Sequence, residues 1–252
     1  MKKAHKLLTA ALVLWLFLVG GCKKEQLNDC FSSTGKDVTI ERNLMEFNKL
    51  RVGDKFRVVL IQDTISPNRV RITGGENLMP GIQTLVTDQE LHIDNCNVCN
   101  FVRSYQRIVT VEVFIKDLTE IVVTGAAEIS TRDTLHLNNL HIDHMALEDT
   151  KLTVNIKNEL FIQSINSGGA TFKGRAKILK GSIEEITNID ARDLACEEVL
   201  IDTHSPLDCY VNASKLLFVN IYSSGNIFYL TEPTDLKEIN DHTGTGQLIK
   251  LD

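Results

Sequence analysis

The pair Cys96 and Cys99, in the stretch "CNVCNF", has the most obvious chemical potential in this sequence. Two cysteines separated by two residues can bind a metal, form a redox-active dithiol or take part in disulfides. Zinc would normally need a second pair at similar spacing, but Cys196 and Cys209 lie thirteen residues apart. A thioredoxin-type pair would open a helix, whereas this pair follows the strand-like segment "LHID". The fold and the compartment must therefore decide between these roles.

Four of the seven histidines invite a metal assignment, namely His92, His136, His141 and His144. A zinc site needs three or four ligands that converge at about 2 Å, and the spacing in "LHLNNLHIDH" does not impose that geometry. In a strand with a two-residue period, His136 and His141 project outward, and we place His144 at a turn. We expect solvated histidines, with neither a metal nor another cofactor.

Acidic residues gather around "EEITNIDARDL", and a pair of carboxylates is what a glycosidase needs across its cleft. Acids in turn segments more commonly satisfy backbone donors. The sequence has no Gly-x-Ser-x-Gly, His-Glu-x-x-His or Walker-type motif. We therefore expect no catalytic residues, and a carbohydrate-active enzyme is the alternative. The candidates weighed for that alternative are Glu184, Glu185, Asp190, Arg192 and Asp193.

The first residues, "MKKAHKLLTAALVLWLFLVGGC", combine a basic start, a short apolar run and small residues before Cys22. The apolar run Leu7–Val19 is shorter than the roughly 20 residues that span a bilayer. The pattern is typical of a secretory signal peptide, and its ending resembles a bacterial lipobox. We predict a signal peptide over 1–21 and a lipid on Cys22, which would anchor the chain to a membrane.

The net charge of the chain after that cleavage argues against a nucleic-acid partner. Removing three lysines from the 27 basic residues leaves 24 against 33 acids, a net charge of −9. An acidic surface offers no electrostatic footprint for nucleic acid. Lys23 is not the aspartate associated with retention at the inner membrane. We expect an outer-membrane lipoprotein, exposed to the periplasm or to the cell surface, with a polar tether over 22–36 and one domain over 37–252.

The domain is rich in short runs of β-branched residues and poor in helical patterns. These runs alternate apolar and polar residues, or are wholly apolar, and Gly, Asn, Asp or Pro usually bounds them, which is typical of strands. An all-β domain follows. The clearest runs are "DVTIE", "FRVVLI", "RVRITG", "LHID", "IVTVEVFI" and "EIVVTG".

The second half of the chain repeats at intervals of about twenty residues. Apolar segments begin at spacings of 19, 20, 18, 21 and 18 residues, and a second short apolar segment follows each by 10–14 residues. Such a period with short strands indicates a solenoid, here a parallel β-helix with coils of about 20 residues. An antiparallel sandwich is the alternative. The segments begin at Ile121, Leu140, Leu160, Ile178, Val199 and Leu217.

The same chain resembles the putative auto-transporter adhesin head domain family, also called the head GIN domain. The resemblance rests on "FNKLRV", "LIQD", "VRITGGENLMPGIQTLV", "LHI", "CNFVRSY", "VTVEVFIKDLTEIVVTGAAEI", "DARDL" and the closing "SSGNIFYL…P…GTGQLIKL". It covers nearly all of the chain after the signal peptide and implies a right-handed β-helix-like fold and, by name, adhesion. The family brings no catalytic residues. Thr231 stands where the family often has Gly, so the last turn is expected to differ.

Export changes how the cysteines are interpreted. Thiols outside the cytoplasm tend to oxidise, and five cysteines remain once Cys22 is lipidated, so at least one has no partner within the chain. Our hypothesis is a disulfide between Cys30 and Cys99 that holds the entering chain onto the loop after the early strands. Cys96 is the alternative partner, and a bond between Cys196 and Cys209 is a further option.

The function expected from these features is that of a non-enzymatic binding module. A β-helix presents flat ladders of outward side chains, which suit a polysaccharide or protein ligand. The outward positions read as a mixture of Asn, Asp, Lys, Thr and His without an aromatic platform, which disfavours a groove that stacks sugars.

Overall fold

The protein is built from β-strands throughout the part that the computed structural model describes, residues 33–97, 108–239 and 244–251. The only helical element within those ranges is a 3-10 turn, η2 (Met79–Gly81). No helix in them is long and apolar enough to cross a membrane. The first seven strands are β1 (Asp37–Asn43), β2 (Lys49–Val52), β3 (Phe56–Gln62), β4 (Arg69–Gly75), β5 (Ile82–Thr87), β6 (Glu90–Asn95) and β7 (Val109–Ile115).

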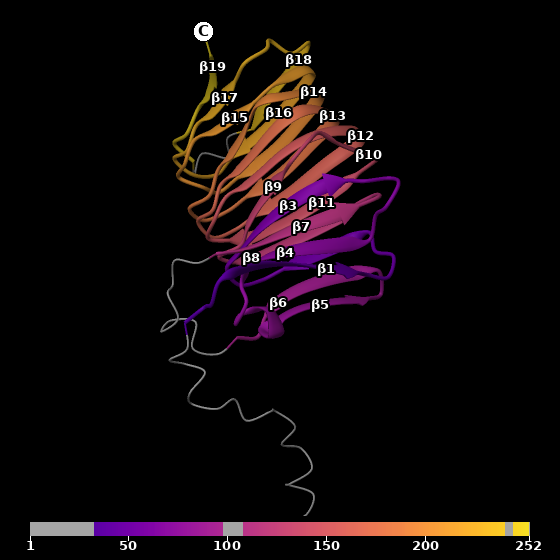
Figure 1. Cartoon of the computed structure of the whole chain (residues 1–252). Coiled ribbons are helices and arrows are strands. Elements are labelled where there is room, and N and C mark those ends of the chain that lie inside the picture. Colours follow the sequence, from indigo (N-terminus) through magenta and orange to yellow (C-terminus); the bar gives the residue numbers. More distant parts are fainter. Residues whose placement is uncertain (1–32, 98–107, 240–243, 252) are drawn as a thin grey trace, which may run out of the picture.

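The strands from β8 onward form successive coils that stack in parallel (Figure 1). All six strand runs predicted in the first half of the chain are confirmed as strands. The later strands are β8 (Glu120–Gly125), β9 (Glu128–Thr131), β10 (Leu135–Leu137), β11 (Leu140–Ala146), β12 (Thr150–Ser164), β13 (Ala170–Ile183), β14 (Ile189–Thr203), β15 (Cys209–Val211), β16 (Ala213–Ile221), β17 (Ile227–Tyr229), β18 (Asp235–Ile239) and β19 (Leu248–Lys250).

The register between coils confirms the predicted solenoid period. Leu140 pairs with Leu160, Leu160 with Leu179, Leu179 with Val199 and Val199 with Leu217, so equivalent residues recur every 18–20 positions. Each long strand contributes to two faces, and a register shift such as that between Ile156 and Glu159 marks the corner between them. The architecture is a parallel β-helix, as predicted.

The interior of the solenoid is a continuous stack of aliphatic side chains. One inward ladder runs through Ile121, Ile142, Ile162, Gly181 and Ile201, all of them buried. At Gly181, the Cδ1 atom of Ile201 occupies the space that a side chain would need, 2.8 Å from where a Cβ atom would lie. Because side chains alternate between the two faces of a strand, every second residue of each strand points into the core.

The N-terminal strands do not follow the order of the chain in space. Strand β2 lies between β6 and β8, and β3 lies between β7 and β9, all in parallel. The first coil is thus inserted between two coils that come later in the sequence. This arrangement departs from the simple sequential solenoid, because its pairs join residues as far apart as Lys49 and Glu120.

An antiparallel cap, defined as β1, β4 and β5 with η2, covers the N-terminal end of the solenoid (Figure 1). Strand β4 pairs antiparallel with β1 and β7, and β5 forms a hairpin with β6. The hairpin turn is built from Asp88 and Gln89, both at positive φ, as a two-residue hairpin turn requires. These antiparallel strands are an addition that the parallel β-helix prediction did not contain.

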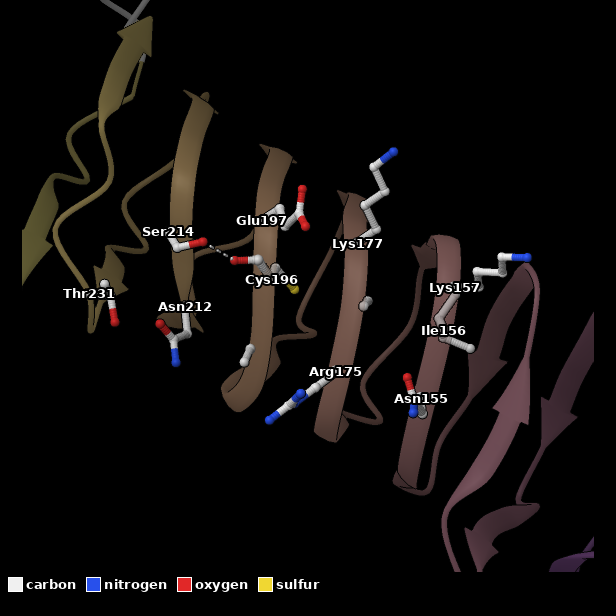
Figure 2. A pocket seen from close by; sticks show the side chains of 12 residues that line it. Asn155, Ile156, Lys157, Arg175, Lys177, Cys196, Glu197, Asn212, Ser214 and Thr231 are labelled. Atoms are coloured by element: carbon white, nitrogen blue, oxygen red, sulfur yellow. Dashed lines mark hydrogen bonds between the residues drawn. The ribbon is translucent and has the colours of Figure 1, made fainter.

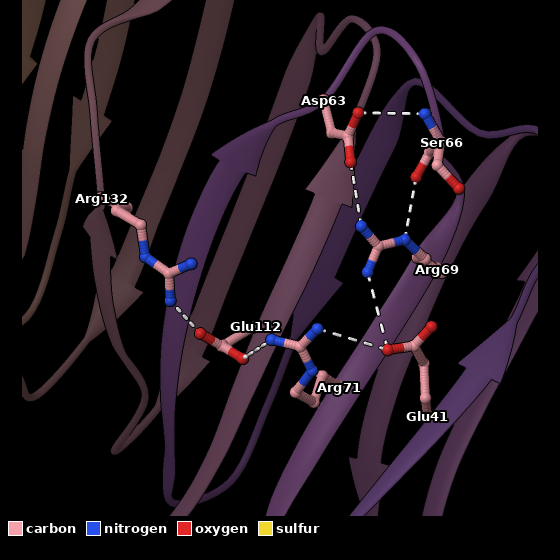
Figure 3. A network of polar contacts seen from close by, with 7 residues as sticks. All are labelled: Glu41, Asp63, Ser66, Arg69, Arg71, Glu112 and Arg132. Carbon is pink, nitrogen blue, oxygen red and sulfur yellow. Dashed lines mark hydrogen bonds and ion pairs between the residues drawn. The ribbon is translucent and has the colours of Figure 1, made fainter.

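Charged side chains hold the cap in register (Figure 3). Arg71 lies opposite Glu41 on one neighbouring strand and opposite Glu112 on the other, and it forms ion pairs with both at 3.4 and 3.0 Å. Arg132, which follows β9, also pairs with Glu112. Arg69 lies over the ring of Phe114, 3.5 Å from its centroid. A one-residue slip would break all of these contacts, so the network specifies the antiparallel pairing.

The last residues of the segment predicted as a tether pack against this cap. Thr34 is buried, its carbonyl oxygen accepts a hydrogen bond from the backbone of Asn77, and the Asn77 side chain donates to the Ser33 carbonyl at 2.8 Å. The Glu76 backbone N–H donates to the Lys36 carbonyl. Residues 33–36 therefore lie against the cap through backbone and side-chain hydrogen bonds.

Candidate functional site

A concave depression of about 440 Å³ lies on the outside of the later coils (Figure 2). Residues of β12, β13, β14 and β16 form it near the corner between the two long faces, together with Asn212 before β16 and Thr231 after β17. Because the depression spans successive coils, only the stacked solenoid can present this surface. The lining residues are Asn155, Ile156, Lys157, Arg175, Ala176, Lys177, Ala195, Cys196, Glu197, Asn212, Ser214 and Thr231.

Small side chains create the hollow. Arg175 pairs with Ala195 on the next coil, so a long outward side chain has a methyl group as its neighbour. Beside them, Ala176 pairs with Cys196, and both are buried. The ladder beyond Ala195 continues with Asn212, whose backbone carbonyl accepts a hydrogen bond from the Cys196 N–H. The surface is therefore recessed at Ala176 and Ala195, where the side chains are small.

Basic side chains flank this floor on both sides. In Figure 2, Arg175 points to the same side of the depression as Asn155 and Asn212, whereas Lys157 and Lys177 point to the opposite side. Among the described residues, no carboxylate lies within 4.0 Å of the charged groups of these three cations.

Glu197 is the one carboxylate in the lining, and it already has a partner. It forms an ion pair with Lys215 at 2.8 Å. The hydrogen bond from Lys215, then its charge and more weakly that of Lys177, lower the pKa of Glu197. An ionised Glu197 bound to Lys215 is not placed to act as an acid catalyst at neutral pH.

Cys196 closes the floor as a structural thiol. It is only 5% exposed, and burial raises its pKa to about 12. At neutral pH the side chain is therefore an uncharged thiol, which is a poor nucleophile. The geometry of the depression suits binding, because cations and amides face an opening and no activated nucleophile lies among the lining residues.

The carboxylates weighed for catalysis are engaged elsewhere. Asp190 accepts a hydrogen bond from the Arg192 side chain at 2.8 Å, and Asp193 pairs with Lys173 at 3.0 Å. Glu185 accepts from the Asn166 backbone at 3.2 Å, and Glu184 accepts from Ser182 at 3.4 Å. None of the four lines the depression. These carboxylates form hydrogen bonds and ion pairs within exposed turns and strands.

The family of the chain follows from its match to a family model. The model described as "Putative auto-transporter adhesin, head GIN domain" matches residues 46–233. The chain belongs to this family. This confirms the resemblance found in the sequence, and the matched range contains the inserted coil, the cap strands β4 and β5 and most of the later coils.

Solved structures share this head GIN fold. A putative adhesin from Bacteroides fragilis is 20% identical and superposes with a TM-score of 0.78, over 87% of this chain and 100% of that chain. A putative adhesin from Parabacteroides distasonis is 19% identical, with a TM-score of 0.63 over 87% and 99%. A protein of the same organism, named as a putative lipid binding protein, is 18% identical, with a TM-score of 0.63 over 86% and 98%. These likenesses establish the fold alone. No curated protein matches the chain.

The cysteines of this head GIN domain are free thiols where the structure describes them. Cys96 is exposed, whereas Cys196 and Cys209 are buried. The bond considered between Cys196 and Cys209 is not formed, because Cys196 pairs across coils with Ala213 and Cys209 with Ile227. Cys22, Cys30 and Cys99 lie outside the described residues, so the lipidation and the Cys30–Cys99 disulfide stay predictions.

The histidines include one clear correction. His136 and His141 are exposed, as expected, and His141 pairs with Asp143 at 2.9 Å. The placement of His144 at a solvated turn is wrong. Strand β11 continues to Ala146, so His144 points inward two residues after Ile142 and is fully buried.

A buried polar network surrounds that histidine. His144 Nδ1 lies 3.2 Å from Ser164 Oγ, and His144 Nε2 lies 3.1 Å from the Glu148 carbonyl oxygen. Thr187 Oγ1 lies 2.8 Å from Ser164 Oγ, and Ser205 donates to the Thr187 carbonyl at 2.6 Å. Burial lowers the pKa of His144. Among the described residues, no three His, Cys, Asp or Glu side chains gather as a metal site. This histidine stabilises a corner of the coils.

The outward ladders also hold aromatic stacks that the sequence prediction did not include. Phe161 stacks on His141 with ring centroids 4.6 Å apart, and Phe228 stacks on Tyr210 at 5.1 Å. Arg192 lies 3.9 Å from the Tyr210 ring centroid. The statement that outward positions lack an aromatic platform is therefore wrong. Residues at equivalent positions of neighbouring coils are separated by the distance between two hydrogen-bonded strands. Aromatic rings at such positions are close enough to stack.

The basic residues of the depression were missed at the sequence level, although a signal for them exists. The triplets "NIK", "RAK" and "ACE" begin at Asn155, Arg175 and Ala195, twenty residues apart. The solenoid period therefore extends from the apolar segments to the charged residues, because a spacing of twenty aligns Lys157 with Lys177, two residues after Arg175.

Proposed function

We propose that this head GIN domain is a non-enzymatic binding module of the bacterial cell envelope, held to the outer membrane by a lipid on Cys22. Its ligand would be a polysaccharide or a protein, exposed to the periplasm or at the cell surface. The lipobox-like sequence before Cys22 and the family of the domain support this proposal. A rigid solenoid on a lipid tether would hold a binding surface away from the membrane.

The observation that carries the proposal is the chemistry of the depression. It combines two amide side chains and two hydroxyl groups, over a floor of small residues, with three cations that have no carboxylate partner in the part of the chain that the structure describes. Such groups recognise a ligand by charge and hydrogen bonds. They do not supply the pair of carboxyl groups that glycoside hydrolysis requires, because Glu197 alone carries a carboxylate among the lining residues.

A binding experiment tests this function directly. The purified full-length chain would be applied to arrays of bacterial polysaccharides and of extracellular proteins. We expect saturable binding to at least one of them and no release of reducing ends from a bound polysaccharide. Release of new reducing ends would support instead a carbohydrate-active enzyme on the same scaffold. An absence of saturable binding to every ligand would contradict the proposal.

The membrane anchor has its own test. Cells that express the full-length chain would be labelled with radioactive palmitate, and their outer membranes would be isolated. We expect the label in the wild-type chain and in the outer-membrane fraction, and neither in a Cys22→Ala variant. A Cys30→Ala variant is the matched control and should still be labelled. Labelling that survives Cys22→Ala would contradict the proposed anchor.

A further inference from the structure

We propose that the depression binds an acidic saccharide unit, a sugar that carries a carboxylate or a sulfate group. This inference rests on the proposed binding function and specifies its ligand. The acidic group would lie between Arg175 and Lys177, and the sugar hydroxyls would reach the amides and hydroxyls of the rim.

The pairing of charges along the later coils carries the argument. Ten basic residues lie between Leu140 and Leu251. Seven of them form ion pairs with carboxylates, and the three that form none among the described residues, Lys157, Arg175 and Lys177, all line the depression. The seven pairs are Lys151–Asp149, Lys173–Asp193, Lys180–Glu159, Arg192–Asp190, Lys215–Glu197, Lys237–Asp235 and Lys250–Glu232.

This concentration is unusual on an acidic protein. The chain carries a net charge of −6, so carboxylates are in excess over basic residues as possible partners. Three cations that share one hollow repel one another, and an anionic ligand would relieve that repulsion. Arg175 also provides a planar fork of donors, the geometry that binds a carboxylate through two hydrogen bonds.

The remaining lining residues favour a sugar over a lipid. The rim carries Asn155, Asn212, Ser214 and Thr231, whose amides and hydroxyls can bond to sugar hydroxyls. None of the large apolar side chains that are exposed in the described structure lies in the lining. A lipid surface would require such apolar side chains. The volume of about 440 Å³ accommodates a sugar-sized group.

The test compares two doubly substituted variants with the same loss of charge. Arg175→Gln with Lys177→Gln removes the unpaired cations of β13, and Lys173→Gln with Lys180→Gln removes two paired lysines of the same strand. Each full-length chain would be reconstituted in phosphatidylcholine nanodiscs and titrated with polygalacturonate, dextran sulfate and neutral dextran. Thermal unfolding would verify that both variants fold.

We expect the wild-type chain to bind at least one acidic polymer and not dextran. The Arg175 and Lys177 variant should bind that polymer at least about tenfold more weakly, the effect of losing charge-assisted hydrogen bonds. The Lys173 and Lys180 variant should remain within about twofold of wild type, because those charges are already neutralised by partners.

Three results would overturn the inference. The first is equal loss of binding in both variants, which would indicate net charge alone, and the second is no loss in either. The third is binding of phosphatidylglycerol vesicles, dependent on Arg175 and Lys177, without binding of either acidic polymer, which would assign the depression to anionic lipid. If the array of ligands described above still shows saturable binding by the Arg175 and Lys177 variant, the binding function stands without this site.

Discussion

The antiparallel cap and the depression on the later coils use charged residues in opposite ways. Arg71 on the cap strand β4 is the register partner of Glu41 on β1 and of Glu112 on the adjoining strand β7, and it forms an ion pair with each. At the depression on β12 and β13, Lys157, Arg175 and Lys177 have no carboxylate partner in the described structure, and Arg175 points to the opposite side from the two lysines (Figure 2). The comparison separates charges that specify a strand register from charges that are free to meet a ligand.

The two regions also differ in how their strands meet. The coils stack in sequence order, so each depends mainly on its neighbours, as in other solenoids. The N-terminal part interleaves β2 and β3 with strands that lie 41 to 71 residues further along the chain. We expect the interleaved region to unfold as a unit and the later coils to show more local openings.

The largest expected effect separates these two modes of unfolding. Phe172→Ala in the coils and Phe56→Ala in the inserted coil each remove a fully buried ring, and each should cost about 3–5 kcal/mol of unfolding free energy. Hydrogen exchange should then lose protection in β12 to β14 for Phe172→Ala, and in β6 to β9 together for Phe56→Ala. The same pattern of lost protection in both variants would remove the distinction.

A glycine in the coils provides the next test. Gly174 has a φ of +105°, and a Cβ there would clash with the Val154 carbonyl oxygen on the adjacent coil. Gly174→Ala should lower the unfolding free energy by about 2–3 kcal/mol, from backbone strain and displaced coils. Gly53→Ala is the control in the inserted coil, since its Cβ would meet only Thr124 Oγ1 at 3.3 Å. Denaturant titrations would measure both unfolding free energies. If Gly174→Ala and Gly53→Ala lower the unfolding free energy equally, the spacing between coils at Gly174 tolerates a side chain.

The pH dependence should come from the coils near neutrality. Burial lowers the pKa of His144 in the folded state, so the unfolded chain takes up a proton first as the pH falls below about 6.5. Stability should therefore decrease below that pH, by at most about 1.4 kcal/mol per pH unit for one proton, and level off below the folded pKa. His144→Asn should flatten this slope, and His141→Asn, at an exposed site, should not.

The cap should respond in a more acidic range. Backbone N–H groups of Ser66 and Ile65, and then Arg69, lower the pKa of Asp63. Its contribution to stability is present above the ordinary pKa of about 3.9 and is lost as the pH falls below it. An Asp63→Asn variant should lose this part of the acid dependence and keep the part from His144. Denaturant titrations between pH 3 and pH 7.5 would resolve the two.

The smallest expected effect compares the charge network of the cap with an isolated pair of the coils. Glu112→Gln breaks the contacts to Arg71 and Arg132 and should cost about 1 kcal/mol. Glu159→Gln breaks only the pair with Lys180 and should cost at most about 0.5 kcal/mol. If Glu112→Gln costs no more than Glu159→Gln, the cap register does not depend on its charges.

The same contrast explains what the sequence could predict. The coils repeat locally, so the inward residues Leu140, Leu160, Val199 and Leu217 revealed both the period and the parallel stacking. The predicted start at Ile178 was one residue early, since Leu179 is the register partner. Interleaving leaves no period in the sequence, because β3 pairs with β7 and β9 across 53 and 71 residues.

The candidate site was less predictable than the fold. The depression depends on the small side chain of Ala195 beside Arg175, and on which cations form ion pairs with carboxylates across coils. These properties require the exact register of each coil. The position of His144 was missed for a related reason, since the end of β11 decides whether that residue is core or turn.

The most direct test of the binding account follows the fate of a bound ligand. Galacturonate oligosaccharides and sulfated dextran oligosaccharides, each of one length, would be incubated with the full-length chain, and the bound fraction would be eluted and analysed by mass spectrometry. The account predicts saturable recovery of oligosaccharides with unchanged mass, and loss of that recovery in the Arg175→Gln, Lys177→Gln variant. Recovery of shortened oligosaccharides, or of none from the wild-type chain, would contradict it.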